Sequence, residues 1–391
     1  MSLSTLRPEA LNAPSSGIVE VFDYGRNRPG LIPLWVGEGD LPTPGFISEA
    51  ATRSLAAGET FYTYQSGLPE LRQSIARYIN GLYGTDLSMD RFHVTIGGMH
   101  ALQMALRMVA GTGDEILIPT PAWPNFYGAA VVSGARPVDV PMTLQPRGND
   151  HVWALDIARM KAAISSHTKA IIINSPSNPT GWTATRAELE QVLTLARENK
   201  LWIIADEIYG RFVYDGSLRA PSFHDIMDET DQIMFVQTLS KNWAMTGWRI
   251  GWLECPVWMA ATVENLVQYS SSGVAAFMQR AAIAALDQGE AFVGHQLARA
   301  RAGRDIVTRG LGQLEHVHFG AVDGAFYLFF RVDGVTDMRQ LALDLVDQAN
   351  VGLAPGTAFG TGAQDYMRMC FARKAEDLEE ATRRIVSVLK R

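Results

Sequence analysis

The fold is decided by the stretch AIIINSPSNPTG, residues 170–181, in which an apolar strand runs into a polar turn. Ala170–Ile173 is apolar and rich in isoleucine, as buried strands are. The turn Asn174–Gly181 follows at once, and in open α/β sheets ligands bind at the carboxyl ends of the strands. Taken alone, an Asn-Pro turn is also an ordinary turn. The stretch therefore predicts a strand of a parallel sheet with a candidate ligand-binding turn at its end.

Similar apolar runs recur on both sides of this strand. They alternate with helix-period segments such as Met99–Val109 and Arg186–Asn199. This alternation is typical of a mostly parallel sheet covered by helices on both faces, so we expect an α/β fold with a large three-layer α/β/α domain. The other expected strands are His93–Ile96, Glu115–Ile118, Leu201–Ala205, Ile233–Val236 and Ile250–Leu253.

The two ends of the chain have a different pattern. Residues 13–45 are dense in Pro and Gly and predict an irregular arm. Beyond residue 290 the sequence predicts a smaller α+β unit. Its expected elements are a long charged helix Gln296–Leu314, a strand Phe326–Val332, a helix Met338–Asn350, a strand Met367–Phe371 and a final amphipathic helix. We expect a large domain over residues 46–289 and a small domain made of residues 1–45 and 290–391.

Composition and net charge indicate which kinds of molecule the protein binds. The chain has 391 residues, of which 47% are hydrophobic, which is enough for a packed core and excludes a disordered or fibrous protein. Its 34 basic and 41 acidic residues give a net charge of −7, so no sequence-wide positive field attracts nucleic acid or anionic lipid. No secretory leader or membrane-spanning apolar run is evident, and the two cysteines favour a reducing compartment. We expect a cytoplasmic protein that acts on small molecules, with no nucleic-acid or membrane partner.

Two further apolar strands end in chemistry-bearing residues. Leu201–Ala205 delivers Asp206-Glu207-Ile208-Tyr209, and a carboxylate buried at a strand end needs a positive partner. The strand Ile233–Val236 is followed by Thr238-Leu239-Ser240-Lys241, with Arg249 further on, which suggests an amine held beside a bound anion. By contrast, His316 and His318 alternate on one strand without Cys or acidic residues at metal-ligand spacing, so no metal site is expected.

In this combination the sequence resembles the aspartate aminotransferase family, the class I and II aminotransferases of fold type I, which depend on pyridoxal 5'-phosphate. The resemblance extends from Leu34–Asp40 to Tyr366–Met369. Its most specific parts are Asn178-Pro179-Thr180-Gly181, Asp206-Glu207-Ile208-Tyr209, and Ser240-Lys241 with Gly247-Trp248-Arg249-Ile250-Gly251.

The resemblance implies a role for each catalytic position. Lys241 matches the lysine that forms a Schiff base with the cofactor aldehyde and then serves as general base and acid. Asp206 matches the carboxylate that pairs with the pyridinium nitrogen and keeps the ring an electron sink. Tyr209 and Asn178 match the pair that hydrogen-bonds the ring oxygen.

The resemblance also implies a phosphate site. Gly97, Gly98 and Met99 open a helix after a strand, so their N–H groups and the positive end of the helix dipole point at one place. Thr238, Ser240 and Arg249 match the side chains that complete this site. Tyr62 matches a tyrosine that reaches the phosphate of the neighbouring subunit, although Tyr64 leaves the choice between the two open. We therefore expect a homodimer with shared active sites.

Three more positions match substrate and ring contacts. Trp123 matches the aromatic residue that stacks on the cofactor ring. Arg368 matches the arginine that binds the substrate α-carboxylate as a bidentate fork. Gly37 and Asn178 match its neighbours in substrate binding.

The expected reaction is transamination by a ping-pong cycle, in which an L-amino acid leaves its nitrogen on the cofactor and a 2-oxo acid collects it. A β-elimination lyase acting on carbon–sulfur bonds uses the same scaffold, and a regulator that senses the cofactor is a remote alternative.

Substrate specificity is left open by the sequence. Gly273, Val274 and Ala275 stand where some aspartate enzymes of the family carry a dicarboxylate-selecting arginine, which argues against strict aspartate specificity. A distal carboxylate would have Arg26 and Arg28 as candidates. An apolar or aromatic side chain is equally compatible with the sequence, given Phe22, Trp35 and Trp243.

Overall fold

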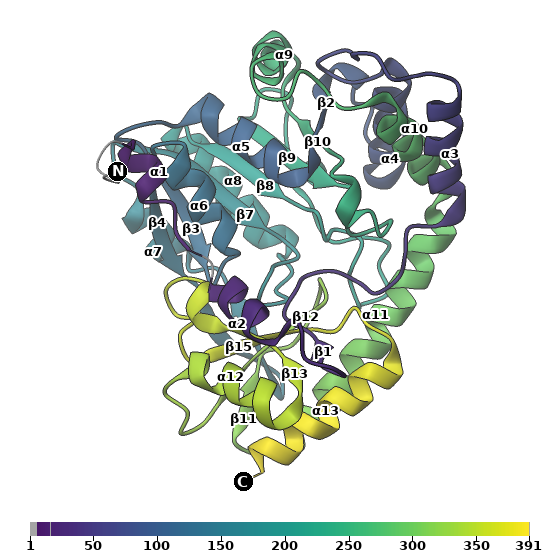
Figure 1. The fold of residues 1–391 in the computed structure, drawn as a ribbon. Helices are drawn as coiled ribbons and strands as arrows, with labels where there is room; N and C mark the ends of the chain where they lie inside the picture. Colours follow the sequence, from purple (N-terminus) through teal and green to yellow (C-terminus); the bar gives the residue numbers. More distant parts are fainter. Residues whose placement is uncertain (1–5, 16, 391) are drawn as a thin grey trace.

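The central element of the fold is a seven-stranded sheet. The computed structural model describes residues 6–15 and 17–390 (Figure 1). The strands lie in the order β2-β10-β9-β8-β7-β3-β4, and all run parallel except β10, which is antiparallel to β9 and β2. They are β2 (Phe92–Thr95), β3 (Glu115–Thr120), β4 (Arg136–Pro141), β7 (Thr168–Asn174), β8 (Trp202–Asp206), β9 (Ile233–Thr238) and β10 (Gly251–Glu254). The mostly parallel sheet expected from the sequence is confirmed.

Helices cover this sheet on both faces. The central strands show it, because successive residues of a strand point to opposite faces and nearly all residues of β7, β8 and β9 are buried. The helices of this part are α3 (Gly45–Ala56), α4 (Pro69–Tyr83), α5 (Gly97–Val109), α6 (Pro124–Val132), α7 (Ile157–Ala163), α8 (Arg186–Asn199), α9 (Ala260–Gln268) and α10 (Ala276–Gln288). Local sequence sets their ends: α8, for example, begins at a capping box between Thr185 and Glu188.

The register of the sheet brings the polar turns together. Asn174 at the end of β7 lies opposite Asp206 at the end of β8, and Asp206 lies opposite Val236 in β9. The turns that follow these three strands therefore meet at one edge of the sheet. This is the edge at which ligands bind in open α/β folds.

A second, antiparallel sheet is built from the C-terminal part. Its order is β11-β12-β15-β14, and α11 and α13 pack together beside it. The elements are α11 (Glu290–Leu311), β11 (Val317–Phe319), β12 (Tyr327–Val332), α12 (Met338–Ala349), β13 (Val351–Gly352), β14 (Ala354–Pro355), β15 (Tyr366–Cys370) and α13 (Ala375–Leu389).

The N-terminal arm joins this C-terminal part. It contains α1 (Pro8–Leu11), α2 (Gly17–Gly25) and β1 (Ile32–Pro33). β1 pairs with β13, and α2 packs against α12 and β14, as the purple α2 beside the yellow-green elements in Figure 1 shows. The arm was expected to be irregular, and this was wrong for α2. Its Pro- and Gly-rich surroundings obscure a short amphipathic helix whose apolar side is buried only by distant parts of the chain.

The sequence also gave no sign of three strands near the edge of the main sheet. These are β4 and the hairpin of β5 (Thr143–Arg147) and β6 (Asp150–Ala154). Their prolines and exposed polar residues hide the strand pattern. Among the described residues, no helix is both long enough and apolar enough to cross a membrane.

Candidate functional site

A cavity of about 270 Å³ lies at the carboxyl edge of the main sheet, between the turns after β7 and β8, the segment before α6, and the N-terminal arm. It brings together seven of the residues singled out from the sequence. They are Gly37, Trp123, Asn178, Asp206, Tyr209, Lys241 and Arg368. Residues separated by more than three hundred positions in the chain thus meet around one small space.

Lys241 lies in the turn after β9, with its amine inside the cavity. Nζ donates a hydrogen bond of 2.5 Å to the carbonyl oxygen of Gly37 and lies 5.9 Å from the centre of the Tyr209 ring. Burial lowers the pKa of the amine to about 8, because a charged group loses its hydration there. A lysine with this pKa is partly neutral near physiological pH and can act as a nucleophile or a base.

Asp206 ends β8 and is almost fully buried, at 2% exposure. Its carboxylate accepts one long hydrogen bond, 3.4 Å, from the backbone N–H of Ile208. Burial raises its pKa to about 7. The charge of Lys241 acts in the opposite direction, but within the described residues Asp206 forms no ion pair, so a cation that enters the cavity would find this carboxylate free.

Tyr209 has a partner that sequence reasoning missed. Its hydroxyl lies 2.7 Å from the hydroxyl of Tyr327, which also lines the cavity. Burial is the main reason why the pKa values of both hydroxyls are raised, so both are neutral at physiological pH. Tyr327 also restricts position 37 to glycine, because a Cβ atom on residue 37 would lie 2.1 Å from the hydroxyl oxygen of Tyr327. A tyrosine at the start of a strand carries no signal that marks such a role.

Arg368 points into the cavity from β15. One guanidinium nitrogen donates to Asn178 Oδ1 at 2.9 Å and another donates to the carbonyl of Trp35. The guanidinium carbon lies 4.7 Å from the centre of the Tyr327 ring and 4.9 Å from that of Phe359. Its Nε has no hydrogen-bond partner among the described residues. A buried guanidinium with a free donor is suited to an anionic ligand.

Asn174 is a second residue that sequence reasoning missed. Its amide donates to the backbone carbonyl of Asp206 at 3.1 Å, and its Oδ1 accepts from the N–H of Asn178 at 2.8 Å. It therefore ties the turn after β7 to the end of β8. The residue stood in the quoted turn, but nothing in its position distinguishes it from the other turn residues.

The residues expected around a phosphate form a separate group beyond the lining of this cavity. Gly97–Met99 make the first turn of α5, and Gly97 has φ +69°. A Cβ atom on Gly97 would lie 2.7 Å from a nitrogen of Arg249, so the backbone and the guanidinium approach closely only because the residue is glycine. Thr238 Oγ1 donates to Ser240 Oγ at 2.8 Å, and Arg249 Nη1 lies 3.5 Å from the same Ser240 oxygen. Met99 itself packs on the core.

Several candidates lie outside the cavity. Arg26 pairs with Asp23, and Arg28 pairs with Asp347, so neither lines it. Trp243 also does not line it and packs in the core near α10 instead. Phe22 packs edge-on against Trp35, with 5.6 Å between ring centres, and only Trp35 reaches the lining. Tyr62 is 94% exposed and is not among the residues that line the cavity.

Comparison with known proteins gives matches over nearly the whole chain. Residues 30–385 match the family model described as aminotransferase class I and II. The chain is 32% identical over 377 residues to the aspartate aminotransferase of Pyrococcus horikoshii, covering 96% of this chain and 94% of that protein. It is 31% identical over 379 residues to aromatic-amino-acid aminotransferase 2 of Thermococcus litoralis, covering 96% of each. The solved structure of aspartate aminotransferase from Thermotoga maritima superposes with a TM-score of 0.89 at 30% identity, covering 99% of this chain and all of that one.

The fold and the site define a fold type I enzyme of pyridoxal phosphate. More narrowly, the chain belongs to the class I and II aminotransferase family, and its reaction is transamination with pyridoxal phosphate as cofactor. The β-elimination that the sequence left open is not favoured by these relatives.

The residues of the site fit this cofactor. Its aldehyde requires an amine, and Lys241 is a buried one with a lowered pKa. Its ring nitrogen requires a carboxylate, and Asp206 is a buried carboxylate that lines the cavity and forms no ion pair within the described residues. Its phosphate requires N–H donors and a cation, which the first turn of α5 and Arg249 place together.

Proposed function

We propose that Lys241 is the residue that binds the cofactor covalently and carries the proton of the reaction, and that the cavity selects an L-amino acid by its α-carboxylate. The observation that carries this proposal is the single cavity in which Lys241, Asp206 and Arg368 converge. When bound, pyridoxal phosphate supplies an aldehyde that bonds amino groups and a ring that withdraws electrons from the attached carbon.

The roles of the chain's own residues follow from their contacts. Arg368, with its unpartnered Nε, binds the α-carboxylate, and Asn178, which already holds Arg368, keeps its fork oriented. Asp206 would pair with the ring nitrogen of the bound cofactor, and Tyr209 and Asn178 would donate hydrogen bonds to its ring oxygen. Lys241 Nζ, which the Gly37 carbonyl holds in place, would take the proton from the substrate Cα and would return it to the cofactor carbon that bears the substrate nitrogen. Trp123 would cover the ring face.

The phosphate group is held outside the cavity lining in this proposal. The N–H groups of Gly97, Gly98 and Met99 donate to it, together with the hydroxyls of Thr238 and Ser240. Arg249 neutralises its charge.

The cavity lining favours an apolar or aromatic donor side chain over a second carboxylate. Beside the site residues, the lining includes Ile18, Val19, Trp35 and Val36. Arg368 and Lys241 are the only cationic residues among the lining residues of the described chain, and both are already assigned. One relative is named for aromatic amino acids and another for aspartate, so the names alone do not decide.

A panel of half-reactions tests reaction and substrate together. The holoenzyme is mixed with phenylalanine, leucine or aspartate, and the visible absorbance of the cofactor and the released 2-oxo acid are followed. We expect one oxo acid per site, no ammonia, recovery of the absorbance on adding a 2-oxo acid, and a rate with phenylalanine at least ~10-fold above that with aspartate. Release of ammonia would establish elimination instead. Faster reaction with aspartate would refute the substrate preference alone.

We also propose a homodimer in which Tyr62 completes the phosphate site of the partner subunit. Tyr62 stands in an exposed aromatic group with Phe61, Tyr64 and Tyr269, whose exposed fractions are 85%, 64% and 88% for these three. Hydrogen bonds between Thr63 and Val274 and between Gln65 and Gln268 hold the two segments of this group side by side. An exposed apolar patch of this kind is typical of an interface.

Mixing two inactive variants tests the shared site. In a hybrid of Tyr62→Ala and Lys241→Ala, one site has both residues intact, so random mixing should restore about a quarter of the wild-type activity. No recovery from a mixture shown by mass to contain hybrid dimers would refute the role of Tyr62. Sedimentation of the wild type gives the oligomeric state itself.

Finally, we propose the domain division at residues 46–289 and 1–45 with 290–391, in a cytoplasmic protein. The main sheet is drawn only from residues 92–254, the second sheet only from residues 317–370, and the arm pairs with β13. Both cysteines, Cys255 and Cys370, are free and buried, which fits a reducing compartment. Limited proteolysis tests the division, and localisation of a tagged protein tests the compartment.

A further inference from the structure

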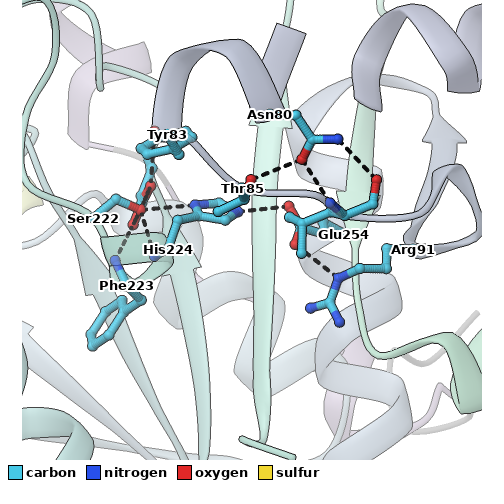
Figure 2. Close-up of polar contacts among 10 residues, drawn as sticks. Asn80, Tyr83, Thr85, Arg91, Ser222, Phe223, His224 and Glu254 are labelled. Atoms are coloured by element: carbon cyan, nitrogen blue, oxygen red, sulfur yellow. Dashed lines mark hydrogen bonds and ion pairs between the residues drawn. The ribbon is translucent and has the colours of Figure 1, made fainter. Parts of the chain in front are cut away.

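A second polar cluster is buried behind the turn that carries Asp206 and Tyr209. It consists of Glu207, Ser222, His224, Glu254 and Arg91, here called the Glu207 network, and none of these residues lines the cavity. Their exposed fractions are between 1% and 7%. Figure 2 shows Ser222, His224, Glu254 and Arg91 following one another across the strands.

Every member of the network is hydrogen-bonded to the next. Ser222 Oγ lies 2.7 and 2.9 Å from the two carboxylate oxygens of Glu207, and His224 Nδ1 lies 2.9 Å from the same Oγ. On its other side, His224 Nε2 lies 2.9 Å from Glu254 Oε2, and Arg91 Nε donates to Glu254 Oε1 at 3.2 Å. The imidazole is also stacked between the rings of Tyr83 and Phe235, at 4.4 and 3.8 Å between centres. His224 therefore has one well-defined position.

The hydrogen bonds link two carboxylates through one imidazole. Ser222 Oγ lies between Glu207 and His224 Nδ1, so the serine hydroxyl connects the glutamate to the imidazole. Glu254 lies between His224 Nε2 and Arg91, so its two carboxylate oxygens contact a ring nitrogen and a guanidinium. Each buried carboxylate of the network therefore has hydrogen-bond partners within the chain, as burial of a polar group requires.

The network and the cavity lie on opposite sides of the same strand end. Ala205 in β8 lies opposite Phe235 in β9, which lies opposite Glu254 in β10, so these side chains share the face on which Phe235 stacks against His224. Asp206 is the next residue, and its side chain points to the other face, where the cavity lies. Glu207 then continues the turn, and its backbone carbonyl accepts from the N–H of Gly210 at 2.8 Å.

We propose that Glu207 is a positioning residue, held by Ser222, His224 and Glu254, which fixes the Asp206–Tyr209 turn so that Asp206 and Tyr209 face the cofactor. The inference rests on the proposed function for the roles of Asp206 and Tyr209. The burial of Glu207 supports it, because burial raises the pKa of this carboxylate while His224 acts in the opposite direction. Without Ser222 and His224, the buried Glu207 carboxylate would keep only two long contacts of 3.4 Å, from the Tyr83 hydroxyl and from the backbone N–H of Phe223.

The chain offers a matched control at the other end of the sheet. Glu115 at the start of β3 is as buried as Glu207, at 6% exposure each, and its carboxylate also accepts from a serine, Ser165, at 2.8 Å. It lies far from the cavity lining. Glu115→Gln therefore reproduces the loss of a buried, serine-bound carboxylate without touching the turn. The test variants are Glu207→Gln and His224→Gln.

The first readout uses the apoprotein and needs no cofactor. Hydrogen exchange of the backbone amides of residues 206–212 is measured by mass spectrometry. We expect both test variants to exchange in this segment at least ~3-fold faster than wild type, whereas Glu115→Gln exchanges there at the wild-type rate. Equal exchange in all four proteins would overturn the proposal.

The second readout is the dissociation constant of pyridoxal phosphate, followed by its visible absorbance. Both test variants should bind pyridoxal phosphate at least ~10-fold more weakly than wild type. The affinity of Glu115→Gln should stay within ~2-fold of wild type, even if its melting temperature falls as much as that of the test variants. Binding unchanged in the test variants would overturn the proposal. If wild type bound no cofactor at all, the proposed function would fail, while the exchange experiment would still decide whether Glu207 fixes the turn.

A milder variant covers the case in which the test variants do not fold. Ser222→Ala removes the link between Glu207 and His224 and keeps both ionisable side chains. It should show both effects in reduced size, and Glu207→Asp should recover part of them. A folded Ser222→Ala protein with wild-type exchange and binding would refute the positioning role.

Discussion

Asp206 and Glu207 are neighbours in the chain and are both buried carboxylates, yet their surroundings differ completely. Asp206 faces the cavity and accepts one long hydrogen bond, from the N–H of Ile208 at 3.4 Å. Glu207 faces the protein interior, where Ser222 Oγ lies 2.7 and 2.9 Å from its two carboxylate oxygens and links it to His224. Arg368 and Arg211 differ in the same way. Arg368 keeps a free Nε in the cavity, whereas Arg211 is paired through both terminal nitrogens with Glu290.

The difference shows where a ligand belongs. A protein interior normally satisfies its buried polar groups, because an unpaired one costs free energy of folding. Groups left unsatisfied around one cavity are therefore groups whose partners arrive with the ligand. The fully paired groups nearby hold in place the backbone that carries these unsatisfied cavity groups. Substitution of a cavity group should therefore reduce ligand binding or turnover, whereas substitution of a fully paired group away from the cavity should mainly reduce stability.

The largest effect is expected for Lys241→Ala on the cavity side. Without its amine the protein cannot bond the cofactor covalently or move the Cα proton, so turnover should fall by ~10⁴-fold or more. Mass spectrometry after borohydride reduction should find no cofactor attached at this position, and the fold, followed by circular dichroism, should remain intact. The control is Lys169→Ala, a half-exposed lysine paired with Asp114, which should keep wild-type turnover. Covalent cofactor retained in Lys241→Ala would contradict the assignment.

Arg368→Gln should have the next largest effect. The α-carboxylate of the substrate loses a bidentate cationic partner worth ~3 kcal/mol, which corresponds to a fall in kcat/KM of ~100-fold. The comparison is Arg211→Gln, which removes a buried arginine whose partners are all in the protein. It should lower the melting temperature and leave the KM for the amino acid unchanged. If Arg211→Gln raised KM as much as Arg368→Gln, the distinction between the two kinds of buried arginine would be wrong.

Asp206→Asn should stabilise the apoprotein at alkaline pH and destabilise the cofactor-bound protein. Burial raises the pKa of Asp206 from its ordinary value to about 7. A raised carboxyl pKa contributes stability that is present below the ordinary value and is lost as the pH rises through about 7. Wild-type apoprotein therefore carries the full cost of the ionised group at pH above ~8, and the neutral Asn variant does not.

The measurement is urea unfolding of both proteins between acidic and alkaline pH. We expect apo Asp206→Asn to be more stable than wild-type apoprotein by on the order of 2 kcal/mol at alkaline pH, with the difference vanishing toward acidic pH. With saturating cofactor the order should reverse, because only wild type gains the carboxylate–pyridinium pair. A variant less stable than wild type in the apo state at alkaline pH would contradict the view that the cost of burial outweighs the attraction between Asp206 and Lys241.

The same contrast explains what could be predicted from the sequence. Asp206, Lys241 and Arg368 were accessible because each stands at a strand end or in a motif that resembles a known family, where a charged residue conflicts with its apolar surroundings. Tyr327 was not accessible, because a tyrosine at the start of a strand is ordinary and only folding brings its hydroxyl to Tyr209.

The supporting residues share that difficulty. Ser222 and His224 lie in one short segment, Glu254 lies in another, and they meet Glu207 only through the non-local pairing of β8, β9 and β10. The helix α2 was missed for a related reason, since its apolar side is buried only against the C-terminal part. Local patterns therefore predicted the sheet and the residues that conflict with burial, whereas the partners that satisfy buried groups required the structure.

Trp123→Phe is the mildest test of the comparison. Trp123 lines the cavity, and its ring plane is perpendicular to that of Phe126, at 5.5 Å between centres. A phenylalanine retains stacking over a smaller area, so we expect a loss of ~1 kcal/mol, or cofactor binding weaker by ~5-fold. Trp153→Phe is the control, because Trp153 is buried and packs on Phe329 and Tyr366. That variant should be less stable to urea with unchanged cofactor affinity, because the Trp153 ring packs on Phe329 and Tyr366 and does not line the cavity. An equal loss of cofactor affinity in both variants would mean that Trp123 acts through general packing and does not meet the ligand.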